Sequence, residues 1–135
     1  MTPQQYRRVA QLAGSWARGL YPRPIAIDVV RKAHSGVGIY FCCFADGLLD
    51  YVGSANRPLD RHGVARRVFE HRCRQRARWR WVWILPLSKK TPREVVFTIE
   101  GQAIGLLRPR GNRGKPLLEA VTSPLPTEIR RGNQE

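Results

Sequence analysis

Two tyrosines stand where a short turn would bring them together. Tyr40 lies in the apolar and aromatic run 37–44, and Tyr51 lies in the similar run 48–53. The dipeptide Asp46-Gly47 between the runs is typical of a β-hairpin with a type I′ turn, in which both central residues have positive φ. In such a hairpin both phenol oxygens can face one cleft. The pair by itself leaves open whether the tyrosines are a cross-strand packing pair or a catalytic pair.

An arginine follows the hairpin. A helix is predicted from Pro58 to about Arg74, because Asn56 can cap it and apolar residues recur at helical spacing. Arg61 lies in its first turn, where the side chain can point back toward the tyrosines. It can equally lie on the solvated surface of the helix, which is the default in so arginine-rich a chain.

A carboxylate lies further along the chain. The sequence Thr91-Pro92-Arg93-Glu94 predicts a capping box with proline at the first helical position, and the helix then continues to Leu107. Glu100 shares a face of this helix with apolar residues, so it is partly shielded from water. A shielded carboxylate needs a compensating cation or hydrogen-bond donors. An arginine and a Mg²⁺ ion, which prefers oxygen ligands, are both suitable.

Taken in order, these residues match a known pattern. Gly38-Ile39-Tyr40, Tyr51-Val52-Gly53, Arg61, Glu100 and Asn112 together resemble the GIY-YIG nuclease domain over roughly residues 37–115. The resemblance implies a DNA endonuclease that depends on Mg²⁺ or Mn²⁺ and cuts one strand per active site. It also implies that all five motif elements supply catalytic residues and that Glu100 binds the metal. No small-molecule cofactor is implied.

One element of the family pattern is absent. Many members carry a His or Tyr one helical turn after the arginine, and this chain has Ala65 there. His62 and His71 are the nearby alternatives, although neither occupies the matching position. This departure favours a second hypothesis, a nucleic-acid-binding module that keeps the fold but is catalytically silent. A third hypothesis is a basic RNA- or ribosome-associated protein in which the tyrosines are only core residues.

The charge of the chain agrees with a nucleic-acid partner. Its 135 residues include 24 Lys and Arg against 10 Asp and Glu, which gives a net charge of +14. Such a balance predicts salt-sensitive attraction to a polyanion, here DNA. Ribosomal and membrane-surface proteins are also basic, so the candidate active site, not the charge, separates these classes. The residues expected to contact nucleic acid are Arg66, Arg67, Arg74, Arg110, Arg113 and Lys115.

These residues require a small α+β domain to position them. We expect a three-stranded, mainly antiparallel sheet flanked by helices over residues 36–115, preceded by a helical extension (1–35) and followed by an irregular tail (116–135). The extension contains an amphipathic helix over 4–20. The third strand is predicted within 79–85, with its three tryptophans on one side covering the core.

Location and redox chemistry follow from what the sequence contains. It has no long uncharged apolar segment, so we expect no signal peptide, no membrane partner and a cytoplasmic protein. Cys42 and Cys43 are adjacent and Cys73 is distant. This spacing fits no metal site, and the odd count argues against a disulfide framework.

Overall fold

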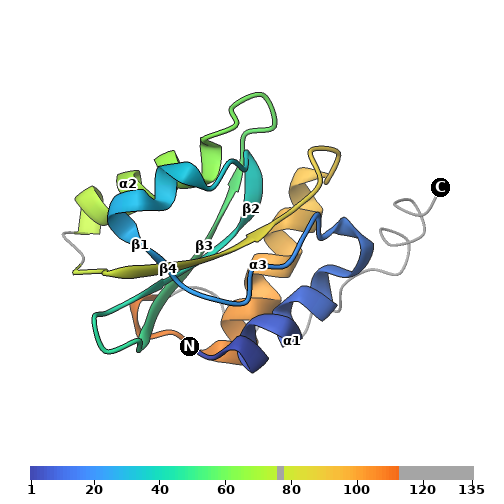
Figure 1. Ribbon diagram of the computed structural model, residues 1–135. Helices are drawn as coiled ribbons and strands as arrows, with labels where there is room; N and C mark the ends of the chain where they lie inside the picture. The colour runs from blue at the N-terminus through green and yellow to red at the C-terminus, as the bar shows by residue number, and fades with distance from the viewer. Residues whose placement is uncertain (76–77, 113–135) are drawn as a thin grey trace.

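The computed structural model describes residues 1–75 and 78–112 and contains helices on both faces of one sheet (Figure 1). The α-helices are α1 (Pro3–Ala13), α2 (Gly63–Gln75) and α3 (Arg93–Leu107). The strands are β1 (Ile25–Ala26), β2 (Val37–Cys43), β3 (Leu49–Asn56) and β4 (Trp81–Pro86). Short 3-10 helices are η1 (Gly14–Trp16), η2 (Ile27–Lys32) and η3 (Arg110–Asn112). No helix within these described residues is long and apolar enough to cross a membrane.

The sheet is antiparallel throughout, with strand order β1-β4-β2-β3. The expected α+β class is therefore confirmed, whereas the expected count of three strands is wrong. The fourth strand, β1, pairs only Ile25 with Val82 and Ala26 with Trp81. Two residues are too few to show a strand periodicity, so this strand leaves no sequence signal.

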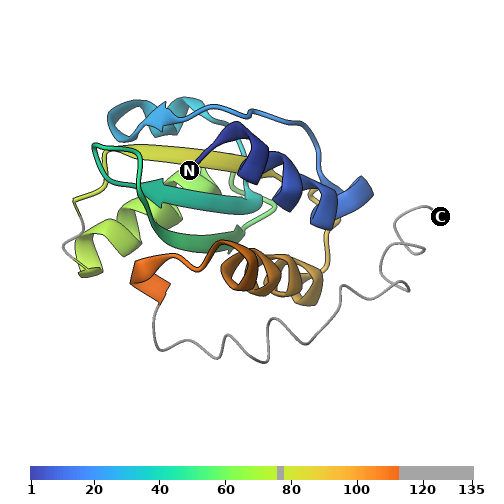
Figure 2. The same ribbon diagram turned by 90° about the horizontal axis from the view of Figure 1, so that it is seen from below.

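Each face of the sheet has its own core. Side chains alternate along β2, so Ile39 and Phe41 pack toward α1 and α3, while Tyr40 and Cys42 pack toward α2 and η2. Both views place α2 on one side of the sheet and α1 with α3 on the other (Figures 1 and 2). Because β2 lies between two strands and two helical layers, all seven of its residues are buried.

The predicted hairpin turn forms at Asp46 and Gly47, but its type differs from the prediction. The Gly47 N–H donates to the Phe44 carbonyl (2.9 Å), and the Phe44 N–H donates to the Leu48 carbonyl (3.0 Å). Gly47 has a φ of 88°, and Asp46 is not among the positive-φ residues of the described chain. The connection is therefore a three-residue loop whose last residue is the left-handed glycine, not a type I′ turn.

Helix α1 is shorter than the predicted segment 4–20. It begins with a capping box in which the Gln5 N–H donates to Thr2 Oγ1 (3.1 Å) and the Thr2 N–H donates to Gln5 Oε1 (2.9 Å). It ends at Ala13, because Gly14 adopts a positive φ of 56°. The chain then continues through η1 away from the α-helical path.

The capping box predicted for α3 does not form. Pro92 occupies the N-cap without a side-chain hydrogen bond, and the Thr91 hydroxyl instead donates to the Ser88 carbonyl (2.6 Å). The helix nevertheless spans the predicted region. Its buried face, with Val96, Ile99 and Ala103 among others, supplies the stabilisation that the cap does not.

The tryptophans around β4 lie on both faces of the sheet, so the prediction of one shared face is wrong. Trp83 packs beside Tyr6 of α1, with ring centroids 5.9 Å apart. Trp79 belongs to the opposite core and stacks on Tyr51 at 5.6 Å. Trp79 precedes the first residue of β4, so the strand alternation does not fix its direction.

Candidate functional site

Tyr40 and Tyr51 lie on neighbouring strands and on the same face, as the hairpin predicts. In the β2–β3 register Tyr40 pairs with Gly53, and Cys42 pairs with Tyr51, so the tyrosines are diagonal neighbours. Their ring centroids are 6.4 Å apart. The exposed fractions are 0% for Tyr40 and 4% for Tyr51, so both rings belong to the core beneath α2.

The absence of a side chain at Gly53 leaves the space that the Tyr40 ring occupies. A Cβ at residue 53 would overlap the Cζ and Oη atoms of Tyr40. The second glycine of the motif is therefore explained by packing, because the phenol lies directly over the backbone of β3. A larger residue would push the ring out of this position.

His71 of α2 completes a three-ring cluster. The Tyr40 Oη and His71 Nδ1 atoms are 2.6 Å apart, within hydrogen-bond distance, in a buried setting. The Tyr51 ring meets the imidazole edge-on, with centroids 5.1 Å apart. Burial raises the pKa of the Tyr40 phenol, so this hydroxyl is neutral at physiological pH. The pair is a short, shielded contact between a phenol and a basic nitrogen.

Burial dominates the electrostatics of the Tyr40 phenol, and charged residues at longer range add to it. The charge of Arg67 lowers its pKa, and that of Glu100 raises it, although burial is the dominant effect. Arg67 lies one turn before His71 on α2, and half-buried Glu100 projects from α3. The structure therefore brings Tyr40 and Tyr51 together on one face of the sheet, whereas Glu100 lies on α3, which packs on the other face.

Arg61, by contrast, is exposed in the loop before α2. The predicted helix start at Pro58 is wrong, because residues 57–62 form two turns and α2 begins at Gly63. The Asp60 N–H donates to the Arg57 carbonyl (3.0 Å), and Asp60 Oδ1 accepts from the His62 N–H (2.9 Å). A polar turn thus occupies the place where the helix was expected.

Arg67 and His71 supply the arginine and the histidine one helical turn apart, which Arg61 and Ala65 do not, because Arg61 precedes α2 and residue 65 is alanine. Residues four apart on a helix share one face, and here that face meets the tyrosines. Ala65 instead packs in the core between α2 and the sheet. The Arg-x-x-x-His spacing was present in the sequence, but counting residues from Tyr51 led to Arg61.

An ion-pair network lies beside the cluster. The two terminal nitrogens of Arg57 donate to the two oxygens of Glu70, each at 2.9 Å. Arg67 Nη1 approaches the same carboxylate at 3.4 Å. The hydrogen bonds from Arg57 hold the pKa of Glu70 below its usual range, so Glu70 is charged at neutral pH. Neither Arg57 nor Glu70 is among the site residues predicted from the sequence.

Asn112 fixes η3 to the outer edge of β3. Its Oδ1 accepts from the Val52 N–H (2.8 Å), and its amide nitrogen donates to the Val52 carbonyl (3.0 Å). The side chain thus satisfies both polar groups of one residue on an edge strand, as a neighbouring strand would. Asn112 is buried, and its observed contacts are structural.

The residues predicted to contact nucleic acid are distributed around the site. Arg66 is exposed and pairs with Asp60 (2.9 Å), and Arg110 is exposed in η3. Arg67 lies on α2, one turn before His71, and approaches Glu70. The side chain of Arg74, and the whole of Arg113 and Lys115, lie outside the described residues.

Glu100 was predicted to bind Mg²⁺. No group of three or more His, Cys, Asp or Glu side chains within residues 1–75 and 78–112 is arranged to hold a metal. A site with one carboxylate still suits Mg²⁺, which is often held by one or two carboxylates with water and phosphate oxygens. The donor set at Glu100 fits that minimal site only.

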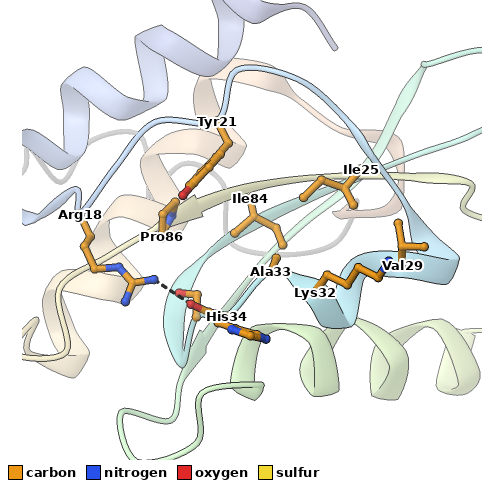
Figure 3. A pocket seen from close by; sticks show the side chains of 10 residues that line it. Arg18, Tyr21, Ile25, Val29, Lys32, Ala33, His34, Ile84 and Pro86 are labelled. Carbon is orange, nitrogen blue, oxygen red and sulfur yellow. Dashed lines mark hydrogen bonds between the residues drawn. The ribbon is translucent and has the colours of Figure 1, made fainter.

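A separate cavity of about 510 Å³ lies between η2, the segment before β1 and the end of β4. Tyr21 reaches into it toward Pro86, Arg18 and His34 border one end, and Lys32 borders the other (Figure 3). Arg18 is held there by donating to the His34 carbonyl (2.8 Å). The residues that line it include no carboxylate, so this cavity offers no oxygen ligand from an acidic side chain and is not the metal site.

A scan against protein-family models, a search of curated proteins and a search of solved structures found no match to this chain.

Proposed function

We propose that the protein is a metal-dependent DNA endonuclease that hydrolyses phosphodiester bonds. The observation that carries this proposal is the buried 2.6 Å contact between Tyr40 and His71, with Arg67 one helical turn before His71 on α2. Hydrolysis of a phosphodiester needs an acceptor for the proton of the attacking water and positive charge around the phosphate. The cluster contains candidates for both, and the net charge of +14 favours a polyanionic substrate.

Tyr40 and His71 would act together on the proton. A free phenolate is disfavoured because burial raises the pKa of Tyr40. The phenol oxygen can instead accept a proton from water while the hydroxyl proton passes to His71 Nδ1, since a neutral imidazole has an acceptor nitrogen. Tyr40 is fully buried in the free protein, so substrate binding must admit one water molecule to its oxygen.

Arg67 takes the arginine role that the resemblance assigned to Arg61. Its planar fork can bind two oxygens of the phosphate, and it lies one helical turn before His71, which contacts Tyr40. Glu100 would hold Mg²⁺, which when bound supplies Lewis-acid stabilisation of the phosphate and the leaving oxygen. Tyr51 would orient the imidazole through its edge-on ring contact, and Asn112 would keep η3 on β3.

Nicking of supercoiled plasmid tests this proposal. Wild-type protein should nick the plasmid with Mg²⁺ and not with a chelator, and Glu100→Gln should reduce nicking about 100-fold or more. Glu94→Gln is the matched control, because Glu94 is an exposed carboxylate in the first turn of the same helix. It should cut like wild type. Equal nicking by Glu100→Gln and wild type would contradict the assignment of Glu100.

A catalytically silent nucleic-acid-binding module is the second candidate. The complete burial of Tyr40 favours it, because bulk solvent does not reach this phenol in the free protein. This candidate predicts salt-dependent DNA binding without nicking at any Mg²⁺ concentration. Tight binding by wild-type protein with no metal-dependent product would select it over the endonuclease.

A further inference from the structure

Glu70 occupies a position suited to an anionic ligand. The two oxygens of its carboxylate meet the two terminal nitrogens of Arg57 in a fork-to-fork arrangement, and Arg67 reaches the same group. A phosphodiester also presents two oxygens in a plane that a guanidinium fork matches. The carboxylate is therefore chemically equivalent to a bound phosphate at this place.

The ion pair is open to exchange. The side chains of Arg57, Arg67 and Glu70 are 36%, 31% and 41% exposed. Ion pairs at such exposure contribute little to stability and are weakened by competing ions. Replacing Glu70 with an external anion would therefore not expose a buried charge or open the core.

The Arg57–Glu70 ion pair also lies on elements that carry the proposed catalytic residues. Arg57 lies one residue beyond the end of β3 and interacts electrostatically with Tyr40, as does Arg67. Glu70 immediately precedes His71 on α2. An anion bound between the two arginines would lie against α2, at the residue that precedes His71.

We propose that Arg57 and Arg67 form a phosphodiester-binding site that the Glu70 carboxylate fills when no nucleic acid is bound. The proposal deepens the endonuclease function and rests on it for the identity of the ligand. On binding, a backbone phosphate of the nucleic acid takes the place of the carboxylate, and Glu70 turns to solvent. Glu70 is thus a built-in competitor that lowers affinity for weakly held ligands.

Binding of a short fluorescein-labelled DNA duplex, measured by anisotropy in chelator, tests the site apart from cleavage. Glu70→Gln removes the competitor and should tighten binding about two- to fivefold. Asp60→Asn is the matched control, because it removes one negative charge paired to an arginine of the same helix but leaves Arg57 and Arg67 paired. It should tighten binding less than Glu70→Gln.

Variants of Arg57 make the test specific. Arg57→Ala should weaken binding and reduce the slope of log affinity against log salt by about 0.9, the value for one phosphate contact. Arg57→Lys keeps the charge but loses the fork, and it should bind between Arg57→Ala and wild type. In the Arg57→Ala background, Glu70→Gln should lose most of its gain, because the two residues act through one site.

Two outcomes would overturn the proposal. One is an affinity gain in Glu70→Gln no larger than that in Asp60→Asn, and the other is an unchanged salt slope in Arg57→Ala. Plasmid nicking by the same proteins separates this proposal from the endonuclease function. If Glu70→Gln binds DNA more tightly than Asp60→Asn but wild type does not nick the plasmid, the phosphate-binding site is supported and the endonuclease function is contradicted. If wild type nicks the plasmid but Glu70→Gln binds no more tightly than Asp60→Asn, the endonuclease function is supported and the phosphate-binding site is contradicted.

Discussion

The two faces of the sheet are packed by different kinds of side chain. On the α1 and α3 face, the buried cluster consists of apolar residues with Tyr6 as its phenol, and that hydroxyl donates to the Ile84 carbonyl and accepts from the Tyr21 N–H. On the α2 face, the phenols of Tyr40 and Tyr51 meet an imidazole inside the core. The Tyr6 hydroxyl is thus paired with backbone groups, whereas the Tyr40 hydroxyl is paired with a side chain.

Because of this difference, substitutions on the two faces should have different effects. A hydroxyl bonded to backbone groups is fixed by the fold and has no titratable partner. A phenol bonded to a histidine can exchange a proton, since both partners change protonation state. Glu100 apart, substitutions on the α1 and α3 face should therefore change mainly the free energy of unfolding, whereas those in the core of the α2 face should also change the chemistry.

The largest effect is expected for Trp83→Ala on the α1 and α3 face. The indole is 4% exposed and packs on Tyr6, so truncation removes apolar burial and leaves a cavity that costs about 3–5 kcal/mol. Urea denaturation measures the change. Trp81→Ala is the control, because Trp81 is 37% exposed and should lose much less. Equal losses in the two variants would contradict the assignment of Trp83 to the core.

A smaller effect is expected for Gly53→Ala on the α2 face. The new methyl group would overlap the Tyr40 phenol, so the ring must move at a cost of about 1–3 kcal/mol. The same movement breaks the contact with His71, and any nicking activity should fall with it. Gly19→Ala is the control, because its Cβ would meet only the Tyr21 ring, at an ordinary 3.9 Å. Wild-type stability in Gly53→Ala would mean that the ring does not lie over this glycine.

Much of the fold was predictable because its signals are local. The hairpin, α3 and the amphipathic α1 all follow from apolar periodicity and a glycine turn within a few residues. Strand β1 was not predictable, since its two residues pair only with a distant strand. The capping sequences show a further limit. Thr2 and Thr91 begin similar patterns, but Thr91 bonds to Ser88 in the preceding loop instead of to its own helix.

The candidate site was predictable only where the sheet register determines it. Tyr40, Tyr51 and Gly53 lie on paired strands, so one turn fixes all three positions. The arginine depends on the length of the loop between β3 and α2, which apolar periodicity does not reveal. Close packing of Gly36 against the backbone of Arg57 and Asp60 holds this loop in its turns. Helix α2 therefore begins only at Gly63. As a result Arg67, not Arg61, lies on the helix one turn before His71.

The smallest expected effect is at the rim of the α2 face, where Glu70 pairs with Arg57. The hydrogen bonds from Arg57 lower the pKa of Glu70 in the folded protein, so this contribution is present above the unfolded pKa of about 4.3 and is lost as pH falls through the folded value. Because the pair is exposed, the loss should not exceed about 1 kcal/mol.

Urea unfolding of wild type and Glu70→Gln at pH 7 and pH ~3 measures this loss of stability. The two proteins should differ more at pH 7 than in acid, and about 1 M salt should shrink the difference because screening acts on exposed charges. A difference that grows in acid would mean that protonated Glu70 stabilises the fold better than the ion pair, which would also remove the reason to regard its carboxylate as a stand-in for phosphate.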